Sequence, residues 1–209
     1  MYRHFFKRLI DITFALIGLP FFLIIFVIFA PIIWLTDFGP VFYNGPRLGK
    51  KGRVFTMYKF RSMRVNSPNL HNADGSTYNG EDDPRVTKIG KFMRKTSLDE
   101  TPQILNVLFG QMSLIGPRAF LISKPIDYET LDEKRKRRLD ALPGITGYSQ
   151  AYFRNSATTE EKIEQDVYYV DHLSFWFDVK IFFRTILSVV LRKNIYVSAE
   201  NAKDALKEK

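Results

Sequence analysis

Two adjacent carboxylates, Asp99 and Glu100, are the clearest chemical feature of this chain. They follow a stretch, residues 85–95, that holds five basic residues and no acid: Arg85, Lys88, Lys91, Arg94 and Lys95. The apolar spacing over residues 104–108 predicts that a helix begins soon after the pair. A helix N-terminus and nearby cations stabilise ionised carboxylates, and they also attract phosphate. One site can therefore hold an anionic nucleophile together with a phosphorylated substrate.

The same residues also allow a purely structural interpretation. Ser97 and Glu100 have the spacing of a capping box, in which a serine and a glutamate satisfy backbone N–H groups at the start of a helix. Pro102 suits the first turn of such a helix. Taken alone, the segment favours the cap, because capping pairs are common and catalytic pairs are rare.

The composition limits the chemistry that the chain can perform. Its 209 residues fit one domain, and its formal charge of +9 predicts acidic partners such as phospholipid headgroups, nucleic acid or phosphorylated substrates. There is no cysteine, which excludes disulfides, thiolate metal sites and cysteine nucleophiles. The three histidines, His4, His71 and His172, do not have metal-ligand spacing. Carboxylates, lysines and arginines must therefore carry any chemistry.

Residues 12–35 carry no formal charge and predict a membrane segment. As one helix they would extend about 36 Å, more than the roughly 30 Å core of a bilayer. Pro20 should kink this helix, and basic residues flank it on both sides. Because positive flanks tend to stay cytoplasmic, a re-entrant helical hairpin fits both ends, whereas a single tilted span with its N-terminus outside is the alternative.

The rest of the chain predicts smaller elements. Strands over 41–43 and 54–60 would form a β-hairpin that places Lys59 and Arg61 on one face, suited either to a diphosphate or simply to solvent. Residues 66–82 read as an aperiodic loop, either a lid or a simple insertion. Residues 173–191 predict an amphipathic helix in the membrane interface, with a buried core helix as the alternative.

Two turns and one basic run are further candidates for binding. Gly116-Pro117 forms a stiff turn before Arg118, whose guanidinium suits phosphate oxygens but is also common on surfaces. The glycines of 143–147 allow close approach to a ligand, or serve an ordinary connection. The basic run 134–138 suits anionic headgroups, nucleic acid or solvent.

The order of the motifs resembles that of one protein family. The matching segments are Lys7–Asp11, Met57–Met63, Asp83–Thr87, Ile89-Gly90, Thr96–Glu100, Pro102-Gln103, Asn106-Val107, Gly110–Arg118 and Pro143–Gly147. Together they closely resemble the bacterial sugar transferase family, the monotopic phosphoglycosyl transferases, in the short form that has only the catalytic unit. Two departures stand out: Leu19-Pro20 replaces the Ser-Pro that is common at the helix break, and Ala119 replaces the second proline of a Pro-Arg-Pro motif.

The resemblance implies an α/β-associated, predominantly helical, membrane-embedded enzyme with a small β-hairpin and interfacial amphipathic helices. Residues 1–36 would form the re-entrant anchor, 37–194 the catalytic domain and 195–209 a mobile polar tail. The expected location is the bacterial inner membrane, with the catalytic domain on the cytoplasmic face.

The resemblance further implies transfer of a sugar-1-phosphate from a UDP-sugar to polyprenyl (undecaprenyl) phosphate, with release of UMP. Asp99 would be the nucleophile that forms an aspartyl-phosphosugar intermediate. Asp99 and Glu100 would neighbour Mg²⁺, with Glu100 either ligating the metal or supporting the nucleophile. Arg94 and Arg118 would clamp phosphate, and Lys59 would be an auxiliary cation.

The expected partners are the UDP-sugar, the polyprenyl phosphate and the phospholipid membrane. No nucleic acid is expected, and a homodimer is left open. Two other functions compete with this interpretation: a glycosyltransferase that releases UDP, and a non-enzymatic basic membrane adaptor.

Overall fold

The computed structural model describes residues 1–68, 70, 78, 80, 82–122, 126–153 and 157–190. Most of the predicted loop 66–82 and the whole of the predicted tail 195–209 lie outside these residues.

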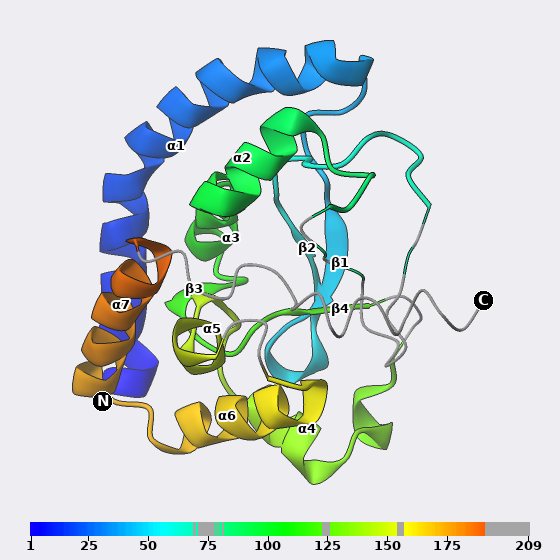
Figure 1. Ribbon diagram of the computed structural model, residues 1–209. Coiled ribbons are helices and arrows are strands. Elements are labelled where there is room, and N and C mark those ends of the chain that lie inside the picture. The colour runs from blue at the N-terminus through cyan, green and yellow to red at the C-terminus, as the bar shows by residue number, and fades with distance from the viewer. Residues whose placement is uncertain are drawn as a thin grey trace.

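The described part of the chain is mostly helical and has two small sheets (Figure 1). The helices and single turns of helix are η1 Tyr2–Phe6, α1 Lys7–Asp37, η2 Lys50–Gly52, α2 Lys88–Thr96, η3 Leu98–Glu100, α3 Gln103–Leu108, η4 Tyr128–Thr130, α4 Glu133–Arg138, α5 Tyr148–Tyr152, α6 Thr159–Asp171 and α7 Phe175–Val190. The strands are β1 Gly45–Leu48, β2 Val54–Met57, β3 Ser113–Ile115, β4 Phe120–Leu121 and β5 Gly144–Thr146.

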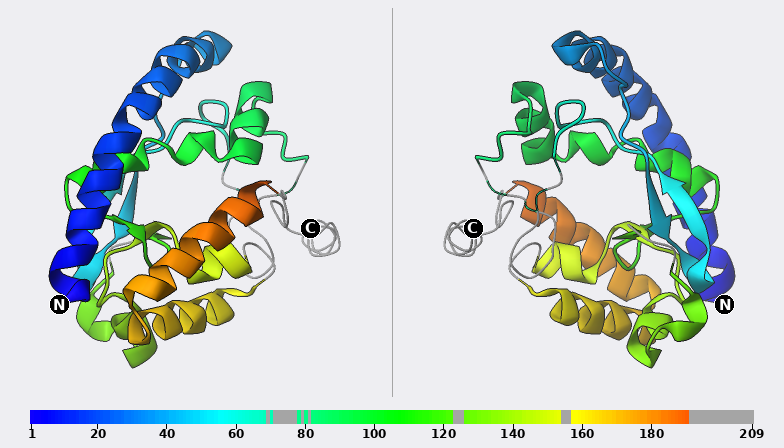
Figure 2. Two further views of the ribbon diagram at one scale, coloured as in Figure 1. Left: turned by 90° about the vertical axis from the view of Figure 1, so that its left-hand side faces the viewer. Right: turned by 90° about the vertical axis from the view of Figure 1, so that its right-hand side faces the viewer.

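Helix α1 is long and apolar enough to cross a membrane. It contains Pro20 and Pro31, and Figure 1 shows that it bends between its two halves. A proline inside a helix removes one backbone N–H and crowds the preceding turn, which accounts for a bend. The sequence predicted either a re-entrant helical hairpin or a single tilted span here. The structure has one continuous bent helix that ends where Phe38 takes a left-handed conformation, φ 53°. Figure 2 shows that α1 follows one edge of the molecule.

One side of α1 belongs to the protein core. Ala15, Phe22 and Ile33 are buried, and they lie in two apolar clusters shared with the rest of the chain. Gly18 lets α3 approach, since a methyl group on it would lie 2.5 Å from Ile104 Cδ1. The other sides of α1 expose large apolar residues along its length, as expected of a helix that contacts lipid.

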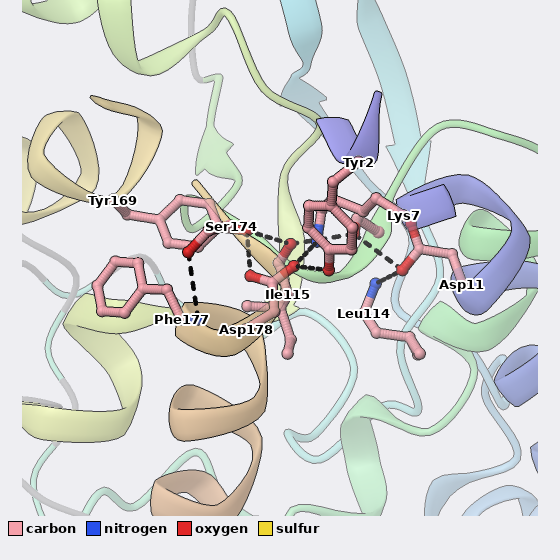
Figure 3. Close-up of polar contacts among 10 residues, drawn as sticks. Tyr2, Lys7, Asp11, Leu114, Ile115, Tyr169, Ser174, Phe177 and Asp178 are labelled. Carbon is pink, nitrogen blue, oxygen red and sulfur yellow. Dashed lines mark hydrogen bonds and ion pairs between the residues drawn. The ribbon is translucent and has the colours of Figure 1, made fainter. Parts of the chain in front are cut away.

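A buried polar cluster joins the start of α1 to α7, as Figure 3 shows. The carboxylate of Asp178 accepts hydrogen bonds from the Tyr2 hydroxyl at 2.6 Å, from Lys7 Nζ at 2.7 Å and from the Tyr169 hydroxyl at 2.8 Å. Four turns and helices therefore meet at one carboxylate: η1, α1, α6 and α7. Breaking a buried ion pair of this kind leaves an uncompensated charge, so the cluster fixes how α1 docks.

The remaining polar residues of the 7–11 motif dock α1 on other elements. Asp11 accepts hydrogen bonds from the Ser113 hydroxyl and the Leu114 backbone N–H, each at 2.9 Å. Arg8 donates to the Leu108 carbonyl at 3.2 Å, near the end of α3. In this structure the motif therefore attaches the helix to the catalytic unit.

Helix α7 is the amphipathic helix that the sequence predicted over 173–191. It runs in the same direction as the first half of α1, because its ring contacts advance along both helices, from Tyr2–Phe175 to Phe14–Phe182. It buries Ile181 and leaves Trp176 72% exposed. The two-faced pattern is confirmed, and the exposed aromatic face lies beside the apolar surface of α1.

The first sheet is antiparallel, in the order β2-β1-β4. The predicted hairpin exists, but its first strand is 45–48 and not 41–43. The tight turn at Lys51 and Gly52, both at positive φ, sets Leu48 opposite Val54 and so fixes the register. Segment 41–43 keeps only one bridge to the hairpin segment, between Phe42 and Phe60.

The second sheet pairs β3 with β5 in parallel. It brings Gly116-Pro117-Arg118 directly against the 143–147 turn. A methyl group on Gly144 would lie 2.1 Å from the Gly116 nitrogen, and one on Gly147 would lie 2.0 Å from the Gly116 carbonyl oxygen. Of the two interpretations that the sequence left open, contact with a ligand or an ordinary connection, the structure shows backbone contact between two motifs.

Candidate active site

The turn that carries Asp99 and Glu100 is held between α2 and α3. The Thr87 hydroxyl caps the start of α2 by accepting from the Gly90 N–H at 2.9 Å. The helix ends at Ser97, which takes the left-handed conformation at φ 57°. This is uncommon for a residue with a side chain and is a feature that recurs at functional sites. The Ser97 side chain makes no capping hydrogen bond, so the capping-box interpretation of Ser97 and Glu100 is wrong.

The structure brings four of the five predicted site residues together. Lys59 Nζ lies 2.8 Å from Asp99 Oδ2 and 3.4 Å from Glu100 Oε1. Arg118 Nη2 lies 3.8 Å from Glu100 Oε1, and its side chain is 53% exposed. The Asp99 side chain is only 3% exposed, so it lies behind these more accessible groups. Two carboxylates and two cations from distant segments thus form one cluster.

The charge state of Lys59 follows from this geometry. Burial opposes its positive charge, but Asp99 and Glu100 outweigh that effect and raise the pKa of Lys59 above its ordinary value. Lys59 is therefore an ammonium at neutral pH. It partly neutralises the carboxylates and offers a cation to an incoming phosphate.

Asn106 holds the segment that leads to Lys59. It is fully buried in α3, and its side-chain oxygen accepts from the Tyr58 N–H at 2.9 Å. Its nitrogen donates to the Thr56 carbonyl at 2.7 Å and to Gln111 Oε1 at 2.6 Å. Asn106 thus has a structural role at the end of β2, where its contact with Tyr58 lies one residue before Lys59.

A buried ion pair holds the backbone of Arg118. Arg138 Nη2 donates to the Arg118 carbonyl at 2.7 Å and also pairs with Asp166. Its guanidinium lies 3.6 Å from the centre of the Phe120 ring. Arg138 and Asp166 are 2% and 1% exposed. The sequence analysis named Arg138 only as part of the basic run 134–138, and it did not single out Asp166.

Arg61 lies apart from this cluster. It does not share a diphosphate face with Lys59, because its guanidinium binds Asp37 and the Ile33 carbonyl at the end of α1. The strand that would have aligned the two side chains ends at Met57.

Arg94, the fifth predicted site residue, donates from Nε to Ser62 Oγ at 2.9 Å. Its part in binding phosphate stays a prediction.

Arg47 is a cation near the site that the sequence analysis did not propose. It lies on β1 and is half-buried. Burial lowers the pKa of Arg47, and the charge of Arg118 contributes, whereas Tyr43 and Glu100 oppose the shift. The nearness of Arg47 to Arg118 depends on the pairing of β1 with β4. Strand β4 has only two residues and no recognisable sequence pattern.

The basic run on α4 is paired with acidic side chains. Four of its cations form six ion pairs: Lys134 with Glu164, Arg135 with Asp132 and Glu160, Lys136 with Glu129, and Arg137 with Asp140 and Asp171. These pairs offset the charge that would attract headgroups or nucleic acid.

The carboxylates of Asp99 and Glu100 suit a magnesium ion whose remaining ligands come from the substrate and water. Asp99 and Glu100 converge on one cationic position, since oxygens of both approach Lys59 Nζ. No group of three or more metal-binding side chains lies among the described residues. Mg²⁺ commonly takes one or two carboxylates and fills its remaining positions with phosphate oxygens and water, which this pair allows.

Comparison with known proteins agrees with these observations. Residues 2–192 match the family described as bacterial sugar transferase. The chain belongs to that family. The match covers α1, the Asp99-Glu100 turn and α7.

Three relatives illustrate the family. The galactosyl transferase CpsE of Streptococcus agalactiae is 45% identical over 88% of this chain and 42% of its own length. A UDP-glucose:undecaprenyl-phosphate glucose-1-phosphate transferase of Klebsiella pneumoniae is 39% identical over 91% of this chain and 41% of its own length. The uncharacterized sugar transferase EpsL of Bacillus subtilis is 40% identical over 93% of this chain and 94% of its own length. The chain thus spans about two-fifths of the first two relatives and nearly all of the third.

Proposed function

We propose that this chain transfers a sugar-1-phosphate from a UDP-sugar to undecaprenyl phosphate and releases UMP. The observation that carries the proposal is the convergence of Lys59 and Arg118 on the Asp99-Glu100 pair. The names of relatives such as the Klebsiella transferase support the same reaction class.

In the proposed first step, a carboxylate oxygen of Asp99 attacks the phosphorus that bears the sugar. The bond between this phosphorus and the bridging oxygen breaks, and UMP leaves with the electron pair. The product is an aspartyl-phosphosugar. In the second step, a phosphate oxygen of the lipid attacks the same phosphorus, the bond to Asp99 breaks, and the lipid diphosphate-sugar forms.

The neighbouring residues have distinct parts in these steps. Lys59 pairs with Asp99, and it can pass from Asp99 to a phosphoryl oxygen as the carboxylate charge is lost. Arg118, which is more exposed, provides two parallel N–H donors for the phosphates. Magnesium, held by Asp99 and Glu100, would neutralise charge that develops on the leaving group.

We also propose that α1 is embedded in the bacterial inner membrane as a re-entrant helix, with both ends and the catalytic unit on the cytoplasmic face. The bend of α1, its exposed apolar sides and the basic residues at both ends support this orientation. The exposed aromatic face of α7 would then lie in the interface of the same leaflet.

The nucleotide product tests the function directly. The full chain in detergent or nanodiscs, given a panel of UDP-sugars, undecaprenyl phosphate and magnesium, should release UMP. Release of UDP instead would indicate a conventional glycosyltransferase. The absence of any nucleotide release across the panel would leave the adaptor as the better interpretation.

A further inference from the structure

Three consecutive residues, Lys59, Phe60 and Arg61, connect the carboxylate cluster to the membrane helix. Lys59 contacts Asp99, as described above, and Arg61 binds the end of α1. Phe60 lies between them and is 0% exposed. A fully buried ring thus lies one residue away from the cation that contacts Asp99.

The ring of Phe60 packs against the second half of α1. Its centroid lies 6.2 Å from that of Phe22 and 6.3 Å from that of Phe26, and both of these residues follow Pro20. The nearly parallel ring of Phe42, at 5.4 Å, completes the aromatic cluster. Aromatic groups packed in this way resist small displacements, because close-packed interiors transmit strain.

The backbone of Phe60 reaches the catalytic turn. Its N–H donates to the Asp99 carbonyl oxygen at 2.9 Å. This bond joins η3 to a segment some forty positions earlier in the chain. A shift of Phe60 would therefore move the backbone of Asp99 and the cation of Lys59 together.

Arg61 fixes the same segment at a second point of α1. Its guanidinium donates to Asp37 Oδ2 at 2.7 Å, to the Pro40 carbonyl at 2.6 Å and to the Ile33 carbonyl at 3.2 Å. These contacts lie beyond the aromatic cluster, at the end of the helix. Phe60 is thus held by α1 from two sides.

We infer that Phe60 is a positioning residue that couples the bent half of α1 to Asp99. The helix is then part of the catalytic apparatus as well as an anchor. This inference rests on the proposed role of Asp99 as the nucleophile. It predicts that loss of the Phe60 ring slows the chemical step, because misplacing a reacting group by about 1 Å can cost on the order of 100-fold in rate.

The test compares Phe60→Ala and Phe60→Leu with the control Phe29→Ala, all in the full chain in nanodiscs. Phe29 packs against the same apolar cluster as Phe60, but its ring stacks on Phe92 of α2, at 6.1 Å, instead of on Phe60. For Phe60→Ala we expect kcat for UMP release to fall by about 10-fold or more, with KM for the UDP-sugar changed by less than about 3-fold. Phe60→Leu should recover most of the rate, and Phe29→Ala should keep kcat within about 2-fold while lowering Tm comparably.

A fourth variant changes α1 instead of residue 60. Phe22→Ala leaves residue 60 intact but removes its partner on α1, so it should reduce kcat in the same direction as Phe60→Ala. If Phe60→Ala and Phe22→Ala both retain the kcat of Phe29→Ala, the coupling is refuted. If Phe60→Ala does not fold, Phe22→Ala decides the matter by the same comparison with Phe29→Ala.

The experiment distinguishes failure of the coupling from failure of the proposed function. A wild-type chain that releases no UMP contradicts the function itself. A wild-type chain that releases UMP, with Phe60 and Phe22 variants as fast as the control, contradicts only the coupling.

Discussion

At the scale of single residues, Asp99 combines two properties that seldom occur together. It is nearly inaccessible, and it is paired with Lys59 at 2.8 Å. Lys59 blocks this carboxylate, so substrate must draw the Lys59 ammonium aside before attack. The diphosphate can do this, because it offers the ammonium a stronger partner than one carboxylate.

Replacing the nucleophile tests this account. Asp99→Asn should fold normally but lose UMP release by several orders of magnitude, since an amide cannot form the acyl-phosphate. Intact-protein mass measurement without lipid should find a phosphosugar adduct on the wild type and none on the variant.

The companion measurement is exchange of labelled UMP into UDP-sugar without lipid, which the reversible first step permits in the wild type. Glu100→Gln serves for comparison, because it changes the neighbouring carboxylate and leaves the nucleophile in place. A folded Asp99→Asn chain with near-normal UMP release would exclude Asp99 as the nucleophile.

At the scale of elements, Arg118 depends on the packing of α4 against α6. Arg138 of α4 and Asp166 of α6 form a buried ion pair, and the same arginine holds the Arg118 carbonyl. The two residues are only 2% and 1% exposed, so water cannot readily replace a lost partner. Such a pair is costly to break from one side, although a well-packed apolar pair can be as stable.

Asp166→Asn should therefore lower the free energy of unfolding by about 3–5 kcal/mol, because it leaves the Arg138 guanidinium buried without its counter-charge. Thermal or denaturant unfolding measures the loss. Glu164→Gln is a matched control on the same helix, since Glu164 pairs with Lys134 at the surface. It should cost no more than about 1 kcal/mol. If the two variants lose equal free energy of unfolding, the buried pair stabilises the fold no more than the surface pair does.

At the scale of the whole molecule, the surfaces of α1 and α7 define one apolar side. The apolar residues of α1 are exposed along its length, and Trp176 and Phe183 extend this surface onto α7. The first half of α1 docks through Lys7 and Asp11, and the second half through Phe22 and Arg61. A straight transmembrane orientation would have to break one of these two sets of contacts.

Single cysteines in this cysteine-free chain test the orientation. Phe5→Cys and Asn44→Cys place thiols at exposed positions on either side of α1. If both ends of α1 are cytoplasmic, both thiols should resist a membrane-impermeant reagent in intact cells and react after lysis. Labelling at position 5 alone in intact cells would indicate a single span and contradict the re-entrant form.

Adding Pro20→Ala to each cysteine variant probes the bend itself. Alanine restores the backbone hydrogen bond that proline lacks, which favours a straight helix long enough to span. Labelling at position 5 should therefore increase in that background.

The sequence alone determined the features that depend on residue type and local spacing. The uncharged stretch 12–35 specified a long apolar helix, and the spacing in 173–191 specified the amphipathic α7. The order of the motifs indicated the family and singled out Asp99, Glu100, Lys59 and Arg118. Each of these signals is readable within one short segment, as helical periodicity or as a motif, and the order of the segments adds the family resemblance.

The tertiary structure decided which of those residues meet. Lys59 reaches Asp99 while Arg61, two positions later, binds α1, because the strand ends at Met57 and the chain then turns between the two sites. Strand β1 lies at 45–48 because one tight turn sets its register. These outcomes depend on contacts between segments that are far apart in sequence, and their free energy comes from burial and pairing that no local pattern encodes.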